Sequence, residues 1–358
     1  MPESSGQQAL LSRALGAFYG LAIGDALGMP TESRSRQDIV SRYGDLLGAF
    51  EPGPPDHPLA AGLPAGTVTD DTEQTVLLAR LIVEYDGEIG PAELASRLLA
   101  WEDSMRARGS LSLLGPSTQR ALGAISAGAS IENAGRFGTT NGAAMRITPV
   151  GVATPSRDRD LLVDRVVAAS RVTHNTGIAL AGAAAVAAAV SAGIDGATLP
   201  DAMRFAAAAA ASAAQRGHWA AGADVGSRIT WAAGLVTGIG LADAMDVVYR
   251  LVGTSLATQE SVPAAFAVAA ASPDDPWLAC RMAASLGGDC DTIAAMAGAI
   301  CGACHGVEAF PASARSTVAR VNNLGLEALA GDLLAVRAAA GPGASPRADP
   351  GAGDDATG

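Results

Sequence analysis

Long runs of small, helix-forming residues constrain this chain more than any other feature of its sequence. Five segments are rich in alanine and leucine, namely residues 73–85, 91–107, 116–128, 178–193 and 201–215. Alanine and leucine favour helices, and alternating strand-like runs bounded by turns are nearly absent. Gly, Pro, Asp and Thr separate the segments, as they do at helix ends. The sequence therefore predicts an all-α protein, a compact bundle of many helices.

The predicted core consists mainly of small side chains. Hydrophobic residues make up 49% of the 358 residues, but aromatic residues make up only 4%. We therefore expect closely packed helices, and since no linker or strict repeat divides the chain, one helical domain over residues 1–337. Residues 338–358 are rich in Gly, Pro and Ala. Such a segment cannot bury enough apolar surface to offset its ordering entropy, so a disordered tail is predicted there.

The charge and the cysteines exclude several classes of function. The formal net charge is −12, and all 24 basic residues are arginines without a basic run. Nucleic-acid and anionic-membrane binding both depend on basic patches, so neither is expected. The N-terminus lacks the pattern of a secretory signal, and the apolar segment 178–194 is mostly Ala and Gly, as in a buried soluble helix. The four cysteines crowd between Cys280 and Cys304, which is no disulfide framework and favours a cytoplasmic protein.

Acidic residues gather at three predicted helix boundaries. The groups are Asp25 with Glu32, Asp70 with Asp71, and Asp289 with Asp291. A single acid at a helix start is a cap worth about 1 kcal/mol, so helix capping is the simplest interpretation of each group. However, two adjacent carboxylates repel each other unless a cation lies between them. Taken alone, each of the two Asp pairs fits capping and metal binding equally well.

The ligands that these groups offer are all oxygen atoms. Carboxylates and threonine hydroxyls suit Mg²⁺, Mn²⁺ or Ca²⁺ rather than zinc. The candidates outnumber the protein ligands that one Mg²⁺ usually takes, which favours two ions that share carboxylates.

A cysteine motif offers a different kind of site. Cys301-x-x-Cys304-His305 matches the pattern of c-type haem attachment. Such attachment requires an exported apo-protein, and on a continuing helix both cysteines lie on one side, as small core residues do. Cys280 and Cys290 lack the CxxC spacing of a zinc site. We therefore expect no haem, no CxxC redox centre and no zinc.

Two further segments have ordinary structural explanations. The segment 139–151, TTNGAAMRITPVG, could present helix N–H groups to an anion, but a plain helix start explains it as well. His174 and Asn175 precede an alanine-rich helix, where a lone histidine is usually a structural hydrogen-bonding residue. The chain has neither a Gly-x-Ser-x-Gly elbow nor a Walker A lysine. Metal-assisted chemistry is therefore the strongest enzymatic option.

In chain order, GLAIGDALG, TDDT, NGAAMR, THN and GGDCDT resemble the ADP-ribosylglycohydrolase family, which includes the dinitrogenase reductase-activating glycohydrolases and the eukaryotic ADP-ribosylhydrolases. The resemblance extends from about Leu15 to His305. It implies an all-α fold with two Mg²⁺ or Mn²⁺ ions at the bottom of a cleft.

The resemblance also implies a set of site residues. The metal ligands would be Thr69, Asp70, Asp71, Asp289, Asp291 and Thr292. The catalytic carboxylates would be Glu32, Asp70 and Asp289, while Asp25 would be a buried structural partner. The substrate-binding residues would be Asn141, Gly142, Ala143, Ala144, Met145 and His174, with Asp103 matched more loosely.

The expected function is that of a metal-dependent hydrolase. It would cleave a glycosidic bond at the anomeric carbon of an ADP-ribosyl group on a protein side chain or a small molecule. A non-catalytic ADP-ribose-binding or regulatory protein, or a hydrolase of another ribosyl compound, is the alternative. The intact acidic groups favour the enzyme. The Pro/Gly-rich segment 50–66, with Asp56 and His57, is predicted to be an ordered loop that shapes the leaving-group side of the cleft.

Overall fold

The computed structural model describes residues 2–110 and 114–340, and in these ranges it contains helices and no strand. The predicted all-α class is therefore confirmed. Three isolated bridges, Arg34 to Gly288, Thr140 to Ala257 and Thr176 to His218, tie loops together.

The first half of the chain contains α1 (Pro2–Gly28), α2 (Arg36–Tyr43), α3 (Asp70–Glu84), α4 (Pro91–Ala107), α5 (Pro116–Ser126), α6 (Ile131–Ala134), α7 (Gly142–Met145), α8 (Thr148–Ala153) and α9 (Arg159–Ser170). The second half contains α10 (Gly177–Ile194), α11 (Leu199–Ala214), α12 (Val225–Val236), α13 (Leu241–Val247), the π-helix η1 (Val248–Val252), α14 (Thr258–Ala271), α15 (Pro276–Ala284), α16 (Cys290–His305), the 3-10 helix η2 (Val307–Ala309), α17 (Ala312–Asn322) and α18 (Leu326–Ala339).

The five helices expected from composition are present as α3, α4, α5, α10 and α11. The segment 50–66 contains no regular element, as predicted. The tail predicted for residues 338–358 lies outside the described residues from residue 341 onward. Ala338 and Ala339 belong to α18, so the last helix continues two residues past the predicted boundary.

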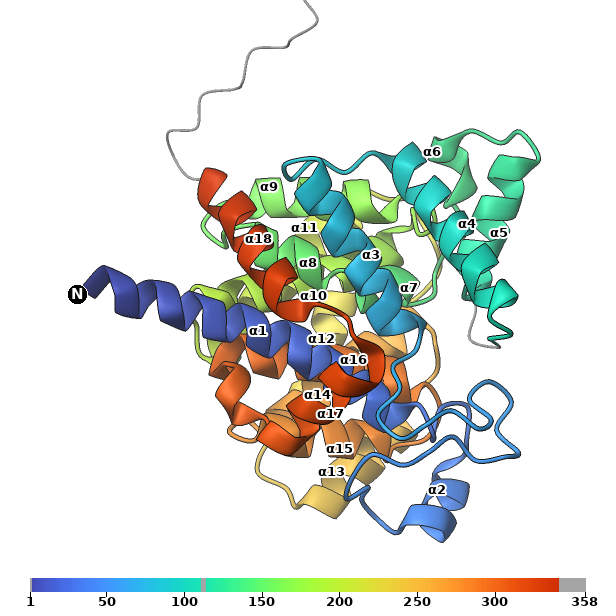
Figure 1. Ribbon diagram of the computed structural model, residues 1–358, viewed down its shortest axis with the longest axis vertical. Helices are drawn as coiled ribbons and strands as arrows, with labels where there is room; N and C mark the ends of the chain where they lie inside the picture. The colour runs from blue at the N-terminus through green and yellow to red at the C-terminus, as the bar shows by residue number, and fades with distance from the viewer. Residues whose placement is uncertain (1, 111–113, 341–358) are drawn as a thin grey trace, which may run out of the picture.

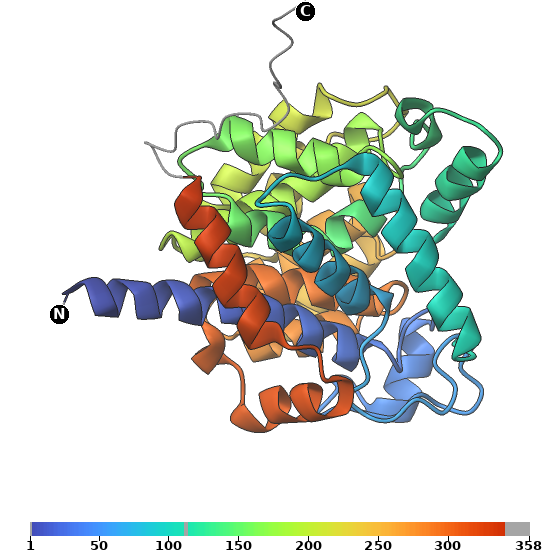
Figure 2. The same cartoon turned by 45° about the horizontal axis from the view of Figure 1, so that its top comes forward.

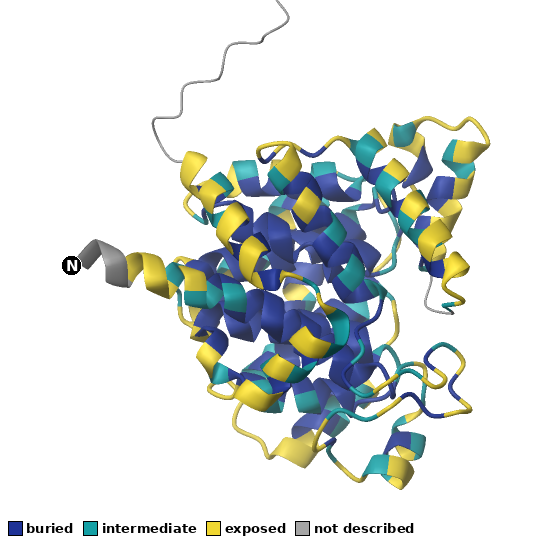
Figure 3. Cartoon of the chain, in the orientation of Figure 1, coloured by how far each residue is buried: buried dark blue, intermediate teal, exposed yellow. Residues whose placement is uncertain are grey.

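Helices α10 and α16 lie in the middle of the bundle. Every residue of α10 after Gly177 is buried, and so is every residue of α16 before His305. Figure 3 shows this arrangement, with buried residues in the centre and exposed residues on the outer helices and loops. Among the described residues, two segments, Gly6–Gly28 and Gly177–Ile194, are long and apolar enough to span a membrane. Of their apolar 18-residue windows, 72% and 94% are buried within the protein. They therefore have the burial of core helices.

The cysteines are part of this core. All four are free thiols, and Cys280, Cys290 and Cys301 have no exposed surface. Their removal from water raises the pKa of Cys290 and of Cys304 to about 12. The prediction that Cys301 and Cys304 are small core residues on one helix is confirmed.

Helices α1 and α16 run antiparallel in unusually close contact. Figures 1 and 2 show α1 running from the projecting N-terminus into the middle of the molecule, and Figure 1 places α16 beside its inner end. Glycines at every fourth position of α1 make this contact: Gly16, Gly20, Gly24 and Gly28. A Cβ atom on Gly24 would lie 2.0 Å from the carbonyl oxygen of Ala294, and one on Gly28 would lie 2.3 Å from the Cα of Asp291. The backbones of the two helices therefore touch, which places the C-terminal end of α1 directly beside the N-terminal end of α16.

The replacement Gly24→Ala should destabilise the protein by about 2 kcal/mol or more, because the new methyl group must push two buried backbones apart. Urea denaturation followed by circular dichroism measures the change. Gly331→Ala is the matched control, since Gly331 is an exposed residue inside α18 with nothing near its missing Cβ. The control should gain about 0.5–1 kcal/mol from helix propensity. Equal stability of the two variants would contradict the close-contact interpretation.

Candidate active site

Asp25, on the last turns of α1, organises the start of α3. Its fully buried carboxylate accepts hydrogen bonds from the backbone N–H groups of Thr69, at 3.0 Å, and Thr72, at 3.1 Å, and from the Thr72 hydroxyl. The negative charge lies at the positive end of the α3 dipole, which is favourable. Asp25 is buried and structural, as predicted, and this contact fixes where Asp70 and Asp71 begin their helix. The prediction set Asp25 apart from the metal ligands, but its carboxylate lies close enough to Asp71 and Asp291 to share a cation with them.

A glycine pair leads into α16. Gly287 and Gly288 have φ angles of +94° and +85°, and a Cβ on Gly288 would lie 2.3 Å from the carbonyl oxygen of Thr254. Only glycine fits such a left-handed turn against another backbone. The same carbonyl accepts a hydrogen bond from the N–H of Asp289 at 2.8 Å. The turn therefore aims Asp289 away from the core.

The segment after α1 pairs with this turn. The N–H of Ser33 donates to the Gly288 carbonyl at 2.8 Å, and the Gly288 N–H donates to the Arg34 carbonyl at 2.9 Å. This short bridge holds Glu32 beside the start of α16. Three segments that are distant in the sequence thus meet: the end of α1, the start of α3 and the start of α16.

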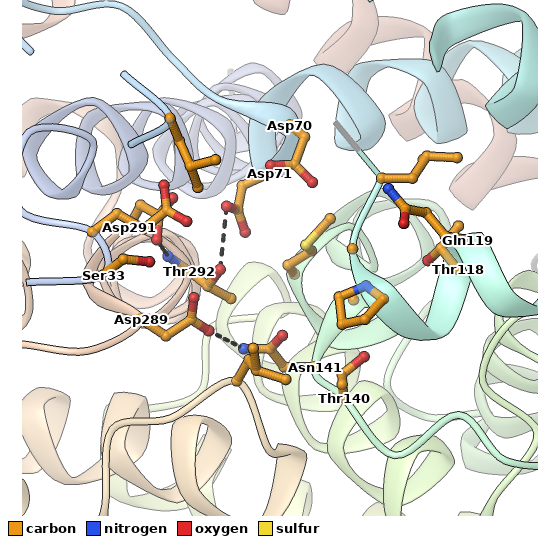
Figure 4. A pocket seen from close by; sticks show the side chains of 18 residues that line it. Ser33, Asp70, Asp71, Thr118, Gln119, Thr140, Asn141, Asp289, Asp291 and Thr292 are labelled. Atoms are coloured by element: carbon orange, nitrogen blue, oxygen red, sulfur yellow. Dashed lines mark hydrogen bonds between the residues drawn. The ribbon is translucent and has the colours of Figure 1, made fainter. Parts of the chain in front are cut away.

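They meet at a cavity of about 370 Å³. Its acidic lining consists of Glu32, Asp70, Asp71, Asp289 and Asp291. Figure 4 shows these aspartates and Thr292 along one side, with Asn141 and Thr140 below and Thr118 and Gln119 opposite. A cavity of this size matches a small-molecule site.

The carboxylates form two overlapping groups. Oxygen atoms of Asp25, Asp71 and Asp291 lie within 4.8 Å of one another, and so do those of Glu32, Asp289 and Asp291. Asp291 belongs to both groups. Either group of three carboxylates could therefore hold a metal ion.

The hydrogen bonds of Asp71 also fit a cation. The hydroxyls of Thr69 and Thr292 each lie 3.2 Å from its Oδ2 atom, whereas its buried Oδ1 atom has no hydrogen-bond partner. A buried carboxylate oxygen without a partner is costly unless an ion compensates it. Among the described residues, no arginine forms an ion pair with Asp25, Glu32, Asp71, Asp289 or Asp291. The oxygen donors present fit a divalent cation that prefers carboxylates.

Burial and mutual repulsion shift the acidity of these groups. Removal from water, with the charges of Asp289 and Asp70, raises the pKa of Glu32 from 4.5 to about 8. Burial raises the pKa of Asp25 and of Asp289 to about 6. Burial and the neighbouring carboxylates also raise the pKa values of Asp71 and Asp291. Without a cation, the protein therefore retains protons here at neutral pH.

The loop segment predicted to bind substrate contributes in part. Asn141, Gly142 and Met145 line the cavity, while Ala143 and Ala144 are buried behind it. The side-chain amide of Asn141 donates to Asp289 Oδ2 and to the Ser261 hydroxyl. Asn141 therefore positions a carboxylate as well as facing the cavity.

Two predicted substrate residues do not line the cavity. His174 has no exposed surface and contacts Thr140 and Thr173 through its ring nitrogens. Asp103 is exposed on α4. The buried face of α4 carries Leu94, Leu98 and Met105, so helical periodicity turns Asp103 toward solvent. The structure does not bring Asp103 to this site.

The loop 50–66 reaches the site through one apolar residue, Leu59. His57 Nδ1 accepts hydrogen bonds from the N–H groups of Leu59 and Ala60, and His57 Nε2 lies 2.9 Å from the carbonyl oxygen of Glu32. Asp56 forms ion pairs with Arg34 and Arg42. Asp56 and His57 therefore hold the loop against the Glu32 segment, and neither lines the cavity.

Several site residues were missed by the sequence reasoning. The other lining residues include Leu114, Gly115, Pro116, Thr118, Gln119 and Leu256. Figure 4 shows Thr118 and Gln119 opposite the carboxylates. Arg146, which is fully buried, lies behind the site and donates to the side chain of Gln74, which in turn donates to Asp70. One signal for Arg146 was available, because it is the only charged residue in the otherwise apolar segment 142–153.

Comparison with known proteins agrees with this geometry. The family model described as ADP-ribosylglycohydrolase matches residues 6–343. The chain is 36% identical over 313 residues to the uncharacterized protein YegU of Escherichia coli, a match that covers 87% of this chain and 93% of YegU. It is 33% identical over 174 residues to the ADP-ribosyl-[dinitrogen reductase] glycohydrolase of Rhodospirillum rubrum, a match that covers about half of each protein, 46% and 51%.

A solved structure supports the same relation. An ADP-ribosylglycohydrolase-related protein complex superposes with a TM-score of 0.67 at 25% identity, and the match covers 92% of this chain and 99% of that chain.

The helical fold with an acidic, oxygen-lined cavity is that of a glycosidase-type hydrolase. The chain belongs to the ADP-ribosylglycohydrolase family, whose members hydrolyse ADP-ribosyl linkages and are generally metal-dependent.

The replacement Glu32→Gln should stabilise the metal-free protein in a pH-dependent way. The folded protein holds a proton on Glu32 up to about pH 8, whereas the unfolded chain releases it near pH 4.5. Wild-type stability is therefore lost as the pH rises between these values, and glutamine avoids the loss. We expect a gain of about 2 kcal/mol or more at pH 8 and under about 0.5 kcal/mol at pH 4.

Urea denaturation in the presence of a chelator measures this gain. Glu132→Gln, at an exposed position outside the cavity, is the matched control and should show no such pH dependence. A gain that is the same at both pH values would rule out an acidic environment around Glu32.

Proposed function

We propose that this protein is a metal-dependent hydrolase that cleaves the glycosidic bond at the anomeric carbon of an ADP-ribosyl group. The observation that carries the proposal is the pair of carboxylate groups that share Asp291 at the floor of the cavity. The two cations would be Mg²⁺, with Mn²⁺ as the alternative. ADP-ribosylated protein side chains and small ADP-ribosyl compounds are both candidate substrates.

The residues that would hold the cations come from three segments. They are Asp25, Asp70, Asp71, Asp289 and Asp291, with the hydroxyls of Thr69 and Thr292, and Glu32 would lie beside the ions. When bound, the ions would orient ribose hydroxyls and lower the pKa of a water molecule. The unpartnered Oδ1 atom of Asp71 supports this assignment.

Glu32 is the best candidate for proton transfer. It lines the cavity, and burial with two neighbouring aspartates raises its pKa to about 8. That value holds for the metal-free protein, and cations bound beside Glu32 would lower it. In its protonated form Glu32 can give a proton to the leaving oxygen or nitrogen. The bond to the anomeric carbon then breaks, the oxygen of water bonds to that carbon, and a carboxylate takes the proton that water releases. Asp70 and Asp289 line the same cavity and are the alternative bases.

The lining residues other than the carboxylates would contact the rest of the substrate. Thr118, Gln119 and Thr140 offer neutral hydrogen-bonding groups, and Leu114 and Leu256 offer apolar surface. These groups carry no charge, so the cations would compensate most of the negative charge of the ligand. The free, buried cysteines are consistent with a reducing compartment, and we propose that the protein acts in the cytoplasm.

Calorimetric titration tests the proposal directly. Metal-free protein is titrated with Mg²⁺ and with Mn²⁺, and then with ADP-ribose in the presence and absence of each metal. The proposal expects metal binding and metal-strengthened ADP-ribose binding. Metal binding without ADP-ribose binding would move the substrate to another ribosyl compound. A failure to bind either metal would overturn the catalytic interpretation.

The replacements Asp70→Ala and Asp289→Ala should each lower metal-dependent hydrolysis of ADP-ribosylated substrates by about a hundredfold or more, because each removes a carboxylate from the cation site. Helicity should be retained, since removing one of several mutually repelling buried charges does not weaken the fold. Asp45→Ala, at an exposed position before the 50–66 loop, is the control that should leave the rate unchanged. Full activity in either site variant would contradict the binuclear site.

A further inference from the structure

A buried chain of hydrogen bonds runs behind the cavity and ends at a residue that lines it. Arg146 Nη2 lies 2.6 Å from Thr173 Oγ1, which lies 2.7 Å from His174 Nδ1. His174 Nε2 lies 3.0 Å from Thr140 Oγ1. Arg146, Thr173 and His174 have no exposed surface, whereas Thr140 lines the cavity, as Figure 4 shows.

Arg146 sets the direction of this chain. A guanidinium group has five N–H donors and no acceptor, so Thr173 Oγ1 must accept from it. The single hydroxyl hydrogen of Thr173 then has two possible acceptors, His174 Nδ1 at 2.7 Å and the Ser170 carbonyl oxygen at 3.4 Å. The Ser170 carbonyl already accepts from the N–H groups of Thr173 and His174. The shorter distance and the occupied carbonyl both favour donation to Nδ1.

The tautomer of His174 follows from this direction. A ring that accepts at Nδ1 carries its hydrogen on Nε2 when it is neutral. Burial and the nearby charge of Arg146 lower the pKa of His174 well below its usual value, so the ring is neutral. Its Nε2–H group therefore donates to Thr140 Oγ1.

Thr140 is left with its own hydroxyl hydrogen to donate. Among the residues described, no hydrogen bond to Thr140 Oγ1 other than that of His174 is present. The ring of His174 packs behind Gly142, where a Cβ atom would lie 3.0 Å from its Cε1 atom. The imidazole thus occupies the wall side of Thr140, and the cavity is the open side.

We propose that His174 is a positioning residue that turns the Thr140 hydroxyl hydrogen into the cavity, so that Thr140 donates a hydrogen bond to an acceptor oxygen of ADP-ribose. The identity of the ligand rests on the proposed function, whereas the donor-to-acceptor direction of the hydrogen bonds rests on Arg146. The proposed contact is with an acceptor oxygen, because the hydroxyl hydrogen of Thr140 has no acceptor among the described residues.

The same arginine directs a second branch. Arg146 Nη1 donates to Gln74 Oε1 at 3.2 Å, which turns the Gln74 amide nitrogen toward Asp70 Oδ2 at 2.9 Å. One buried cation therefore sends hydrogen-bond donors toward both the carboxylate side and the Thr140 side of the cavity. Both series of hydrogen bonds begin at Arg146, and in both the donors point toward the cavity.

The tautomer is measurable in the ligand-free protein. Long-range 1H–15N correlation spectra distinguish imidazoles that are protonated at Nδ1 from those protonated at Nε2. The chain has four histidines, so the spectrum of His174→Gln assigns the signals of His174. We expect the wild type to contain only the Nε2–H tautomer. Thr173→Val should contain a mixture of both tautomers, whereas Thr173→Ser should contain only the Nε2–H form. An Nδ1–H tautomer in the wild type would overturn the proposal.

Affinity measures the donation to the ligand. Calorimetry in the presence of Mg²⁺ should show that Thr140→Val weakens ADP-ribose binding by about tenfold relative to Thr140→Ser, the loss of one hydrogen bond. Thr139→Val, on the same loop but outside the cavity, is the matched control and should bind as the wild type does. Circular dichroism verifies that each variant is folded. Equal affinities of the valine and serine variants at position 140 would overturn the role of the hydroxyl.

The outcomes separate this proposal from the proposed function. Failure of the wild type to bind ADP-ribose, with the Nε2–H tautomer present, would contradict the proposed ligand and leave the direction of the chain intact. Binding of ADP-ribose with an Nδ1–H tautomer would support the function and overturn the positioning role of His174.

Discussion

The backbone contact between α1 and α16 is the interaction on which the rest of the site depends. Four glycines on α1 allow the two helix backbones to approach without intervening side chains. Larger residues would separate the axes by the width of a side chain. The ends of the helices would then move apart, and the carboxylates of Asp25 and Asp291 would no longer fall within one cation-binding group. The packing of these two helices therefore sets the distances between the carboxylates that could hold a metal ion.

That close packing brings several carboxylates together, and their mutual repulsion lowers the stability of the folded protein. Carboxylates from three segments lie at the floor of one cavity, and burial with mutual repulsion raises the pKa of Glu32, Asp71 and Asp291. Asp25 recovers part of the cost through hydrogen bonds from the start of α3. In the metal-free protein, bound protons relieve the remaining repulsion, and cations would relieve it in the proposed enzyme. The clustered carboxylates thus lower the stability of the metal-free fold, and the same cluster gives the perturbed pKa values that are typical of active sites.

The opposite side of the cavity relies on neutral groups with a fixed direction. Arg146 contributes its charge from behind the wall, and its donors orient Gln74 on one side and Thr173 on the other. Hydroxyls, amides and imidazoles can each donate or accept a hydrogen bond. A buried group that only donates fixes which of the two its neighbours do. The polar wall is therefore ordered before a ligand arrives, and ordering beforehand reduces the cost of binding.

The sequence by itself determined the helical class, the positions of α3, α4, α5, α10 and α11, and the acidic groups at helix boundaries. Helix propensity and capping act over a few neighbouring residues, so they can be predicted from the sequence. The tertiary structure alone decided which of those groups meet. It added Asp25 to a cation-binding group, buried His174 behind Thr140 and placed Asp103 in solvent. These outcomes depend on how helices distant in sequence pack, and that packing is set by shape and volume over the whole core.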